Sequence, residues 1–173
     1  MADTKEIVVN NIAEDNKKLI KKVIKYLERK ETFTKFAGIV NDSKKFDINY
    51  FEYKLEFGNI LIIVENEDSN IEAVGLLDEK IRHLGLEESD CFYLKHFAAD
   101  SLHAANAFME KAFKLCKEYN KTKIKAETMK PGVMYSYYKR MNGVEIDTDG
   151  IFKDMTFKYL NGNVEPAMIE FKA

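Results

Sequence analysis

The stretch FYLKHFAADSLHAANAFMEKAFKLCKEY, residues 92–119, decides which fold the chain adopts. Its first six residues are mostly aromatic and apolar and predict a strand, whereas apolar residues from Ala105 onward recur at helical spacing. The predicted helix carries one apolar stripe: Ala105, Phe108, Met109, Ala112, Leu115, Cys116 and Tyr119. Between the strand and the helix lies DSLHAANA, residues 100–107. A junction of small and polar residues is either a helix cap or a cradle of backbone N–H groups for a phosphate.

Other elements are predicted on both sides of this stretch. Alternating or β-branched runs predict strands at 5–12, 59–65, 71–77, 123–128, 144–148 and 152–160. Helical periodicity predicts a helix at 14–30, and a later helix is framed by Pro131 and Gly143. Aromatic-rich residues 32–57 predict one short helix with irregular connections, and a tail carrying Pro166 closes the chain. This order predicts one α/β domain spanning 1–173, a central mixed sheet with helices on both faces.

The composition excludes several classes of protein. With 46% hydrophobic residues, 32% charged residues and a formal net charge of -2, the chain is typical of a soluble globular protein without a basic field for nucleic acid. No stretch resembles a secretory signal or reaches the length of a membrane span, so we expect a cytoplasmic protein with no membrane partner. Cys91 and Cys116 fit no metal-binding spacing, which predicts free thiols and no metal.

Three places in the sequence carry a family resemblance. YLKHF leads into a loop, AFMEKA begins a long amphipathic helix, and YYKRMNGVEI joins a later helix to a strand. Together they resemble the GNAT superfamily of acetyl-CoA-dependent N-acetyltransferases, over about residues 7–159. The family loop reads Q/R-x-x-G-x-G/A before a helix that begins A-L-L-x-x-A, which places the loop on DSLHAA, residues 100–105. Asp100 stands where the family has Gln or Arg, and His103 stands where it has the first Gly.

The resemblance implies that acetyl-CoA is the co-substrate and that its pyrophosphate lies over the start of the helix. The implied contacts are Lys95, Phe97, His103, Ala104, Ala105, Asn106 and Ala107. Asp100 would oppose the anion unless its side chain instead caps the helix, whereas a protonated His103 would contact the phosphate. A glutamate in place of Ala105 is expected to abolish CoA binding while leaving the fold intact.

Two side chains are candidates for the proton transfers of amine acetylation. Tyr138 is the implied acid for the departing thiolate, although Asn142 makes its spacing to Gly143 one residue longer than the family pattern. Tyr135 or Tyr137 is therefore an alternative acid, and core packing is an alternative use of any of the three. His96 is the candidate base because imidazole titrates near neutral pH, and packing is the alternative use of a histidine on a strand.

The resemblance implies direct transfer of an acetyl group from acetyl-CoA to a primary amine of a small molecule or peptide. One alternative is a catalytically silent GNAT-fold protein that binds acyl-CoA or another ligand, which the altered loop favours. The other is a structural or partner-binding domain whose helix is merely capped by DSLHAA. Late strands in such folds often pair between subunits, so a homodimer is one expected assembly. The aromatic side chains of residues 32–57 either line an acceptor pocket or pack in the core.

Overall fold

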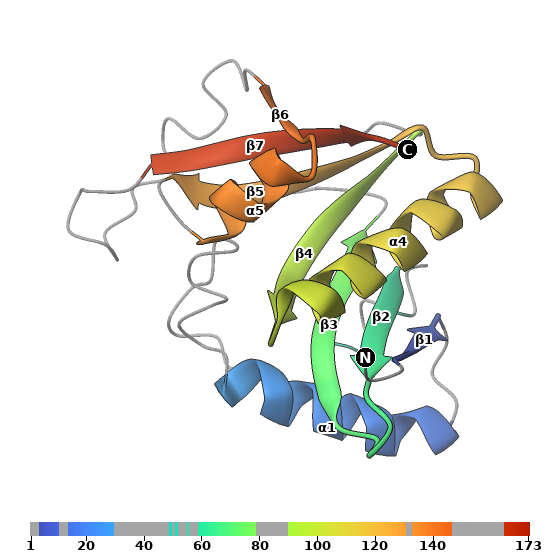
Figure 1. The fold of residues 1–173 in the computed structure, drawn as a ribbon. Coiled ribbons are helices and arrows are strands. Elements are labelled where there is room, and N and C mark those ends of the chain that lie inside the picture. Colours follow the sequence, from blue (N-terminus) through green and yellow to red (C-terminus); the bar gives the residue numbers. More distant parts are fainter. Residues whose placement is uncertain are drawn as a thin grey trace.

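The computed structural model describes residues 4–10, 14–29, 59–78, 90–130, 133–146 and 165–173, together with residues 49, 51 and 55. Within these residues the strands form one mixed sheet in the order β1-β2-β3-β4-β5-β7-β6 (Figure 1). The strands are β1 (Lys5–Val9), β2 (Ile60–Glu65), β3 (Ile71–Asp78), β4 (Cys91–Ala99), β5 (Lys123–Lys130), β6 (Val144–Ile146) and β7 (Glu165–Lys172). The helices are α1 (Glu14–Arg29), α4 (Leu102–Glu118) and α5 (Val133–Arg140).

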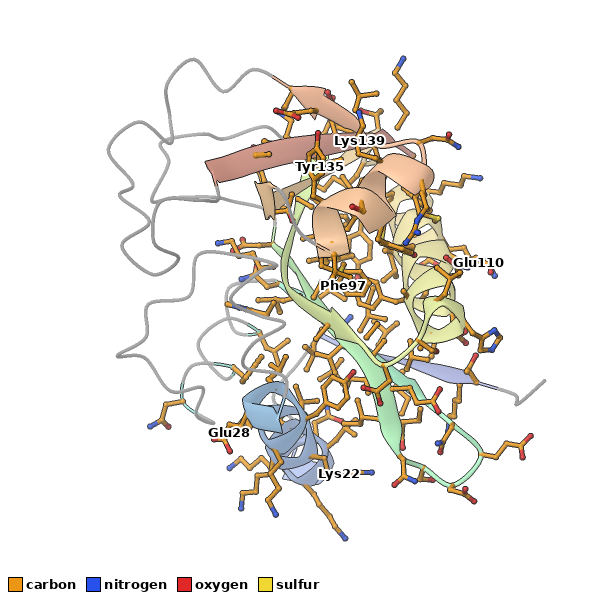
Figure 2. All side chains as sticks on the ribbon, turned by 60° about the vertical axis from the view of Figure 1, so that its left-hand side comes forward. Lys22, Glu28, Phe97, Glu110, Tyr135 and Lys139 are labelled. Carbon is orange, nitrogen blue, oxygen red and sulfur yellow. The ribbon has the colours of Figure 1, made fainter. Side chains whose placement is uncertain are left out.

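Helices cover both faces of the sheet. Strand β2 shows why: Ile60 and Ile62 pack into the cluster that holds α4 and α5, whereas Leu61 and Ile63 pack into the cluster that holds α1. A strand buried on both faces reads as a continuous apolar run, as ILIIVE does. Figure 2 shows the interior position of Phe97 and the outward position of Glu110 on α4. The prediction of a mixed α/β sheet flanked by helices is confirmed.

The prediction that the chain ends in a tail is wrong, because the last residues form strand β7. This strand pairs antiparallel with β5 from Glu165 to Lys172 and with β6 from Met168 to Glu170. Pro166 lies before the β6 pairing begins, where β7 pairs only with β5 among the described strands. Proline lacks a backbone N–H, so it is tolerated where a strand is paired on one side only. The predicted strand at 152–160, the short helix within 32–57 and Pro131 lie outside the described residues.

Two helices end at an asparagine in the left-handed conformation. Asn142 has φ 66, and the next amide, that of Gly143, donates to the carbonyl oxygen of Tyr138 at 2.9 Å. Asn120 has φ 58 after α4, where the Lys121 amide donates to the carbonyl of Cys116. Both ends follow the Schellman pattern, so Asn142 terminates α5 and Gly143 is the residue after it. Tyr119 forms the C-cap of α4 and is 41% exposed, so its predicted place on the buried stripe is wrong.

Strand β4 contains a bulge opposite Gly75 of β3. Val74 pairs with Ala98 and Leu76 with Lys95, so two β4 residues face the single Gly75. A Cβ added at Gly75 would lie 2.3 Å from Cζ of Phe108 on α4. Phe108 stacks on Phe97 of the bulge, with ring centroids 4.5 Å apart. The absence of a side chain at Gly75 therefore lets α4 lie directly against the sheet beside the bulge.

We expect Gly75→Ala to reduce the free energy of unfolding by about 1–3 kcal/mol, because the added methyl group overpacks the contact with Phe108. Urea denaturation followed by circular dichroism measures the change. Adding Phe108→Leu to this variant makes room for the methyl group, so the double variant should lose less than the sum of the two single losses. Additive losses would contradict this account of the contact.

Candidate functional site

Strands β4 and β5 are paired over only the first part of their lengths. Their parallel ladder runs from Cys91↔Lys123 to Leu94↔Ala126. Beyond Leu94, β4 continues beside β3 and β5 continues beside β7, so the two strands run apart (Figure 1). We call residues 95–99 of β4 and 127–130 of β5 the strand divergence. On the side that faces β5, the backbone of residues 95–99 has no ladder partner in the described part of that strand.

The bulge of β4 falls inside the strand divergence. His96, the predicted base, is half-buried there and has φ 54, a left-handed conformation that is unusual for a residue other than glycine. Bulges bend a strand and redirect its side chains and backbone groups, and they are frequent next to active sites. The side-chain nitrogen of Lys95 lies 3.1 Å from Oδ2 of Asp78 on β3. Because that ammonium is paired with a carboxylate, the group that Lys95 offers to a ligand is its backbone.

The N-terminus of α4 begins directly after β4. Ser101 is the N-cap, and its Oγ accepts a hydrogen bond from the amide of Ala104 at 3.1 Å. The Ala105 amide donates to the carbonyl of Ser101 and so begins the helical ladder. The amides of Leu102 and His103, ahead of these, donate to none of the described residues. Two backbone N–H groups and the positive end of the helix dipole are therefore available to an anion.

Asp100 does not cap the helix, so that expectation is wrong. Its Oδ1 instead accepts a hydrogen bond from the hydroxyl of Tyr26 on α1, at 3.1 Å. Its own amide donates to the carbonyl of Glu72 at 2.7 Å. Serine is a preferred N-cap residue, so the position of Ser101 just before the helix is a sequence signal that could have identified it as the cap. Nothing local in the sequence indicated Tyr26, which lies 74 residues from Asp100.

The residues at the start of α4 that were predicted to contact the cofactor include both buried and exposed side chains. Ala104 and Ala105 are on the buried face of α4 and pack in the core, and their small side chains let the helix backbone lie close to the sheet. Ala107 is half-buried, whereas His103 and Asn106 are exposed. The expectation that Ala105→Glu leaves the fold intact is therefore wrong, because the substitution would bury a carboxylate in an apolar core. Leu102, which is 61% exposed, is the better position for testing this helix end.

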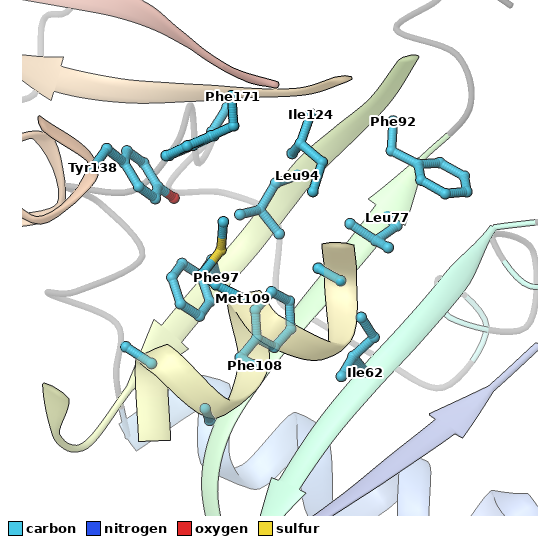
Figure 3. Close-up of a cluster of buried hydrophobic side chains, with 14 of the residues drawn as sticks. Ile62, Leu77, Phe92, Leu94, Phe97, Phe108, Met109, Ile124, Tyr138 and Phe171 are labelled. Carbon is cyan, nitrogen blue, oxygen red and sulfur yellow. The ribbon is translucent and has the colours of Figure 1, made fainter. Parts of the chain in front are cut away.

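Tyr138 lies on the face of the sheet that α4 and α5 cover. Its ring is stacked at 6.3 Å from that of Phe97 and meets Phe171 edge-on at 5.4 Å. Figure 3 shows its hydroxyl directed toward β4. The side chain is only 1% exposed, and this burial raises the pKa of Tyr138 well above its ordinary value. The hydroxyl therefore keeps its proton at neutral pH.

The hydroxyls of the other two candidate acids, Tyr137 and Tyr135, form hydrogen bonds with side chains of α4 and β6. The Tyr137 hydroxyl donates to Oδ1 of Asn106 at 2.9 Å, which joins α5 to α4. Burial raises the pKa of Tyr137 to about 12, so this proton is also retained. The Tyr135 hydroxyl donates to Oε1 of Glu145 on β6 at 2.7 Å, in an exposed position. Only Tyr138 combines deep burial with a hydroxyl that is directed toward β4.

Metal and thiol chemistry have little support in the part of the chain that the structure describes. That part contains no group of three or more His, Cys, Asp or Glu side chains placed to hold a metal ion. Cys91 and Cys116 are buried free thiols, as predicted, and desolvation raises the pKa of Cys116 to about 11. A protonated, buried thiol is a poor nucleophile. Among the described helices, none has the length and apolar character needed to cross a membrane.

Comparison with known proteins identifies the fold. No protein-family model and no curated protein matches the sequence. Among solved structures, the chain is similar to a GNAT-family acetyltransferase from Staphylococcus aureus Mu50, with a TM-score of 0.63, 16% identity, and coverage of 97% of this chain and 99% of that one. The GNAT domain of PAT from S. lividans gives a TM-score of 0.66 at 12% identity, with 99% and 90% covered. The chain has the GNAT fold.

A third solved structure of the same fold contains CoA. It is a protein from Mycobacterium tuberculosis, solved in complex with CoA, with a TM-score of 0.59, 12% identity, and coverage of 96% of this chain and 99% of that one. At these identities the likeness establishes the GNAT fold of this chain and leaves its chemistry to be argued from its own residues. The strand divergence, the β4 bulge and the N-terminus of α4 are the features of this GNAT fold on which that argument rests.

Proposed function

We propose that this protein transfers an acetyl group from acetyl-CoA directly to a primary amine of a small molecule or peptide. One observation carries the proposal: the strand divergence and its bulge lead straight into a helix N-terminus with two available amides. An acyl carrier with a pyrophosphate at one end and a thioester at the other suits this arrangement. The GNAT fold and its occurrence in a CoA complex support the same assignment.

The backbone supplies most of the proposed contacts with CoA. The amides of Leu102 and His103 would bind the pyrophosphate, with the exposed side chains of His103 and Asn106 beside it. Buried Ala104 and Ala105 hold this turn close to the sheet, and Ala107 continues the same small-residue run. Lys95 and Phe97 of β4 lie within the strand divergence, where a backbone N–H group would polarise the thioester carbonyl.

Two side chains of this chain would move protons in the proposed reaction. The amine nitrogen attacks the carbonyl carbon and forms a C–N bond as the C–S bond breaks, with its electron pair passing to sulfur. The thiolate takes the proton of the Tyr138 hydroxyl. The proton released by the amine leaves through His96 or through water and restores the neutral tyrosine. The products are an amide and the free thiol of CoA, so atoms and charge balance.

The geometry favours Tyr138 over its neighbours as the acid. Its hydroxyl is directed toward β4, where the thioester would lie. Burial raises the pKa of Tyr138 and so makes it a weaker acid, which means that it protonates the thiolate only if a second proton reaches it in the same step. The Tyr137 hydroxyl already donates a hydrogen bond to Asn106, and the Tyr135 hydroxyl donates one to Glu145. A tyrosinate would be costly in so buried a place, so reprotonation must accompany the transfer.

A catalytically silent CoA-binding protein is the second candidate function. The departures at Asp100 and His103 favour it, because they change the loop that binds phosphate in the family without changing the fold. Both candidates predict CoA binding, and only the enzyme releases thiol from acetyl-CoA in the presence of an amine. The two are therefore separated by one assay of thiol release across a panel of small amines and peptides.

We expect CoA to raise the melting temperature of the wild-type protein. Ligand at 100 times its Kd adds about 2.7 kcal/mol of stability, which corresponds to about 5–10 °C for a chain of this length. Differential scanning fluorimetry with CoA, acetyl-CoA and, as a control, pantetheine without the pyrophosphate measures the effect. No shift at millimolar CoA would contradict both candidate functions. A CoA shift without thiol release on any amine would favour the silent protein.

A further inference from the structure

Asp100 occupies a difficult position in the proposed CoA site. It immediately precedes Ser101, the N-cap of α4, and is two and three residues before the available amides of Leu102 and His103. An aspartate readily accepts a hydrogen bond from the backbone N–H two residues further along. A carboxylate turned toward the helix would thus occupy an amide that the pyrophosphate needs and would also repel the anion.

The Asp100 carboxylate is instead bound from the opposite face of the sheet. The hydroxyl of Tyr26 donates to Oδ1 of Asp100 at 3.1 Å and lies 3.0 Å from the carbonyl oxygen of Glu72. Tyr26 belongs to α1 and packs in the cluster on that helix's face, whereas α4 packs on the other face. The tyrosine is 1% exposed, so the surrounding core fixes its ring.

We propose that Tyr26 is a positioning residue that holds the Asp100 carboxylate toward α1 and so keeps the N-terminus of α4 open to the pyrophosphate of CoA. The inference rests on the proposed CoA site and goes beyond it, because Tyr26 itself lies on the far face of the sheet from α4. The Asp100 amide adds to the arrangement, since its 2.7 Å hydrogen bond to Glu72 fixes the backbone from which the carboxylate extends. Removing the Tyr26 hydroxyl takes away the hydrogen bond that draws Oδ1 of Asp100 toward α1, which favours rotation of the carboxylate toward the Leu102 amide.

The charge on Asp100 distinguishes this role from a merely structural one. Tyr26→Phe keeps the ring in the core and removes only the hydroxyl, so CoA affinity should fall about tenfold at low ionic strength. The loss should shrink to about threefold in 0.5 M salt, because an exposed charge is screened. Asp100→Asn removes the charge and keeps an oxygen acceptor, so it should bind CoA within about twofold of wild type. In the Asp100→Asn background, Tyr26→Phe should cost less than twofold.

Isothermal titration of CoA into the wild type, the two single variants and the double variant, each at low and high salt, tests the proposal. Tyr135→Phe is the matched control, because it removes a hydroxyl that is bonded to Glu145 on β6. An equal loss from Tyr26→Phe in both backgrounds, or no loss at all, would overturn the proposal. If Tyr26→Phe does not fold, Asp100→Asn decides alone, since a tenfold gain in affinity would show that the carboxylate already opposes the anion. Wild-type protein that binds no CoA would overturn the proposed function and this inference together, whereas a wrong pattern with normal wild-type binding overturns only the inference.

Discussion

Replacing Tyr138 with phenylalanine should lower turnover about a hundredfold and leave the affinity for acetyl-CoA within about twofold. The hydroxyl acts only when the thiolate leaves, so its loss raises the barrier without weakening ground-state binding. The ring keeps its packing against Phe97 and Phe171, so the fold should survive. Release of the CoA thiol measures turnover, and titration calorimetry measures affinity.

The pH profile of turnover gives a second test of Tyr138. Burial raises its pKa above the ordinary value of about 10, so the acid keeps its proton and turnover should not fall between pH 8 and pH 10 on its account. Tyr135→Phe is the control and should turn over like the wild type, because its hydroxyl donates to Glu145. If Tyr137→Phe loses turnover and Tyr138→Phe does not, the acid has been assigned to the wrong tyrosine.

Replacing Leu102 with glutamate should weaken CoA binding about seventyfold. The side chain is 61% exposed at the first position of α4, so a carboxylate there lies in water beside the available amides. A negative charge about 4 Å from a phosphate costs about 1 kcal/mol in water and about 4 kcal/mol near a protein surface, and the middle of that range is roughly seventyfold in Kd. Titration calorimetry at low salt measures the loss.

The same substitution should leave the CoA-free protein at least as stable as the wild type, because the positive end of the helix dipole stabilises a carboxylate in the first turn. A melting temperature without CoA that is unchanged or raised would therefore separate lost binding from lost folding. Lys117→Gln makes the same change in net charge in the last turn of α4 and should bind CoA normally. Unchanged CoA affinity in Leu102→Glu would place the pyrophosphate away from this helix end.

Much of the fold was predictable because it is encoded locally. The stripe on α4 from Ala105 to Cys116 and the apolar run of β2 are properties of neighbouring residues, so periodicity alone located both elements. The end of the chain was misread for the opposite reason. Strand β7 carries a proline and is held by its pairing with β5 and β6, and such pairing leaves no periodic signal in EPAMIEFK itself.

The candidate site was predictable only in its position along the chain. The sequence located the junction between β4 and α4, and it named Tyr138, His96 and the small residues after Asp100 as candidates. It did not separate Tyr138 from Tyr135 and Tyr137, because three nearly consecutive tyrosines on one short helix look alike until their partners are known. The partners Asn106 and Glu145 lie 31 and 10 residues away, on different elements.

The order of the described elements up to β6, the apolar faces of the helices and the place of a phosphate-binding turn could all be predicted from the sequence, because each depends on residues within a few positions of one another. Three further features became apparent from the folded arrangement alone: Ser101 rather than Asp100 caps α4, Tyr26 holds Asp100, and Gly75 makes room for Phe108. Those outcomes depend on which distant side chains the packed sheet brings within a few ångströms, and on burial that fixes which hydroxyl faces which acceptor. The tertiary structure thus turned a recognisable junction into a specific arrangement of amides, carboxylate and hydroxyls.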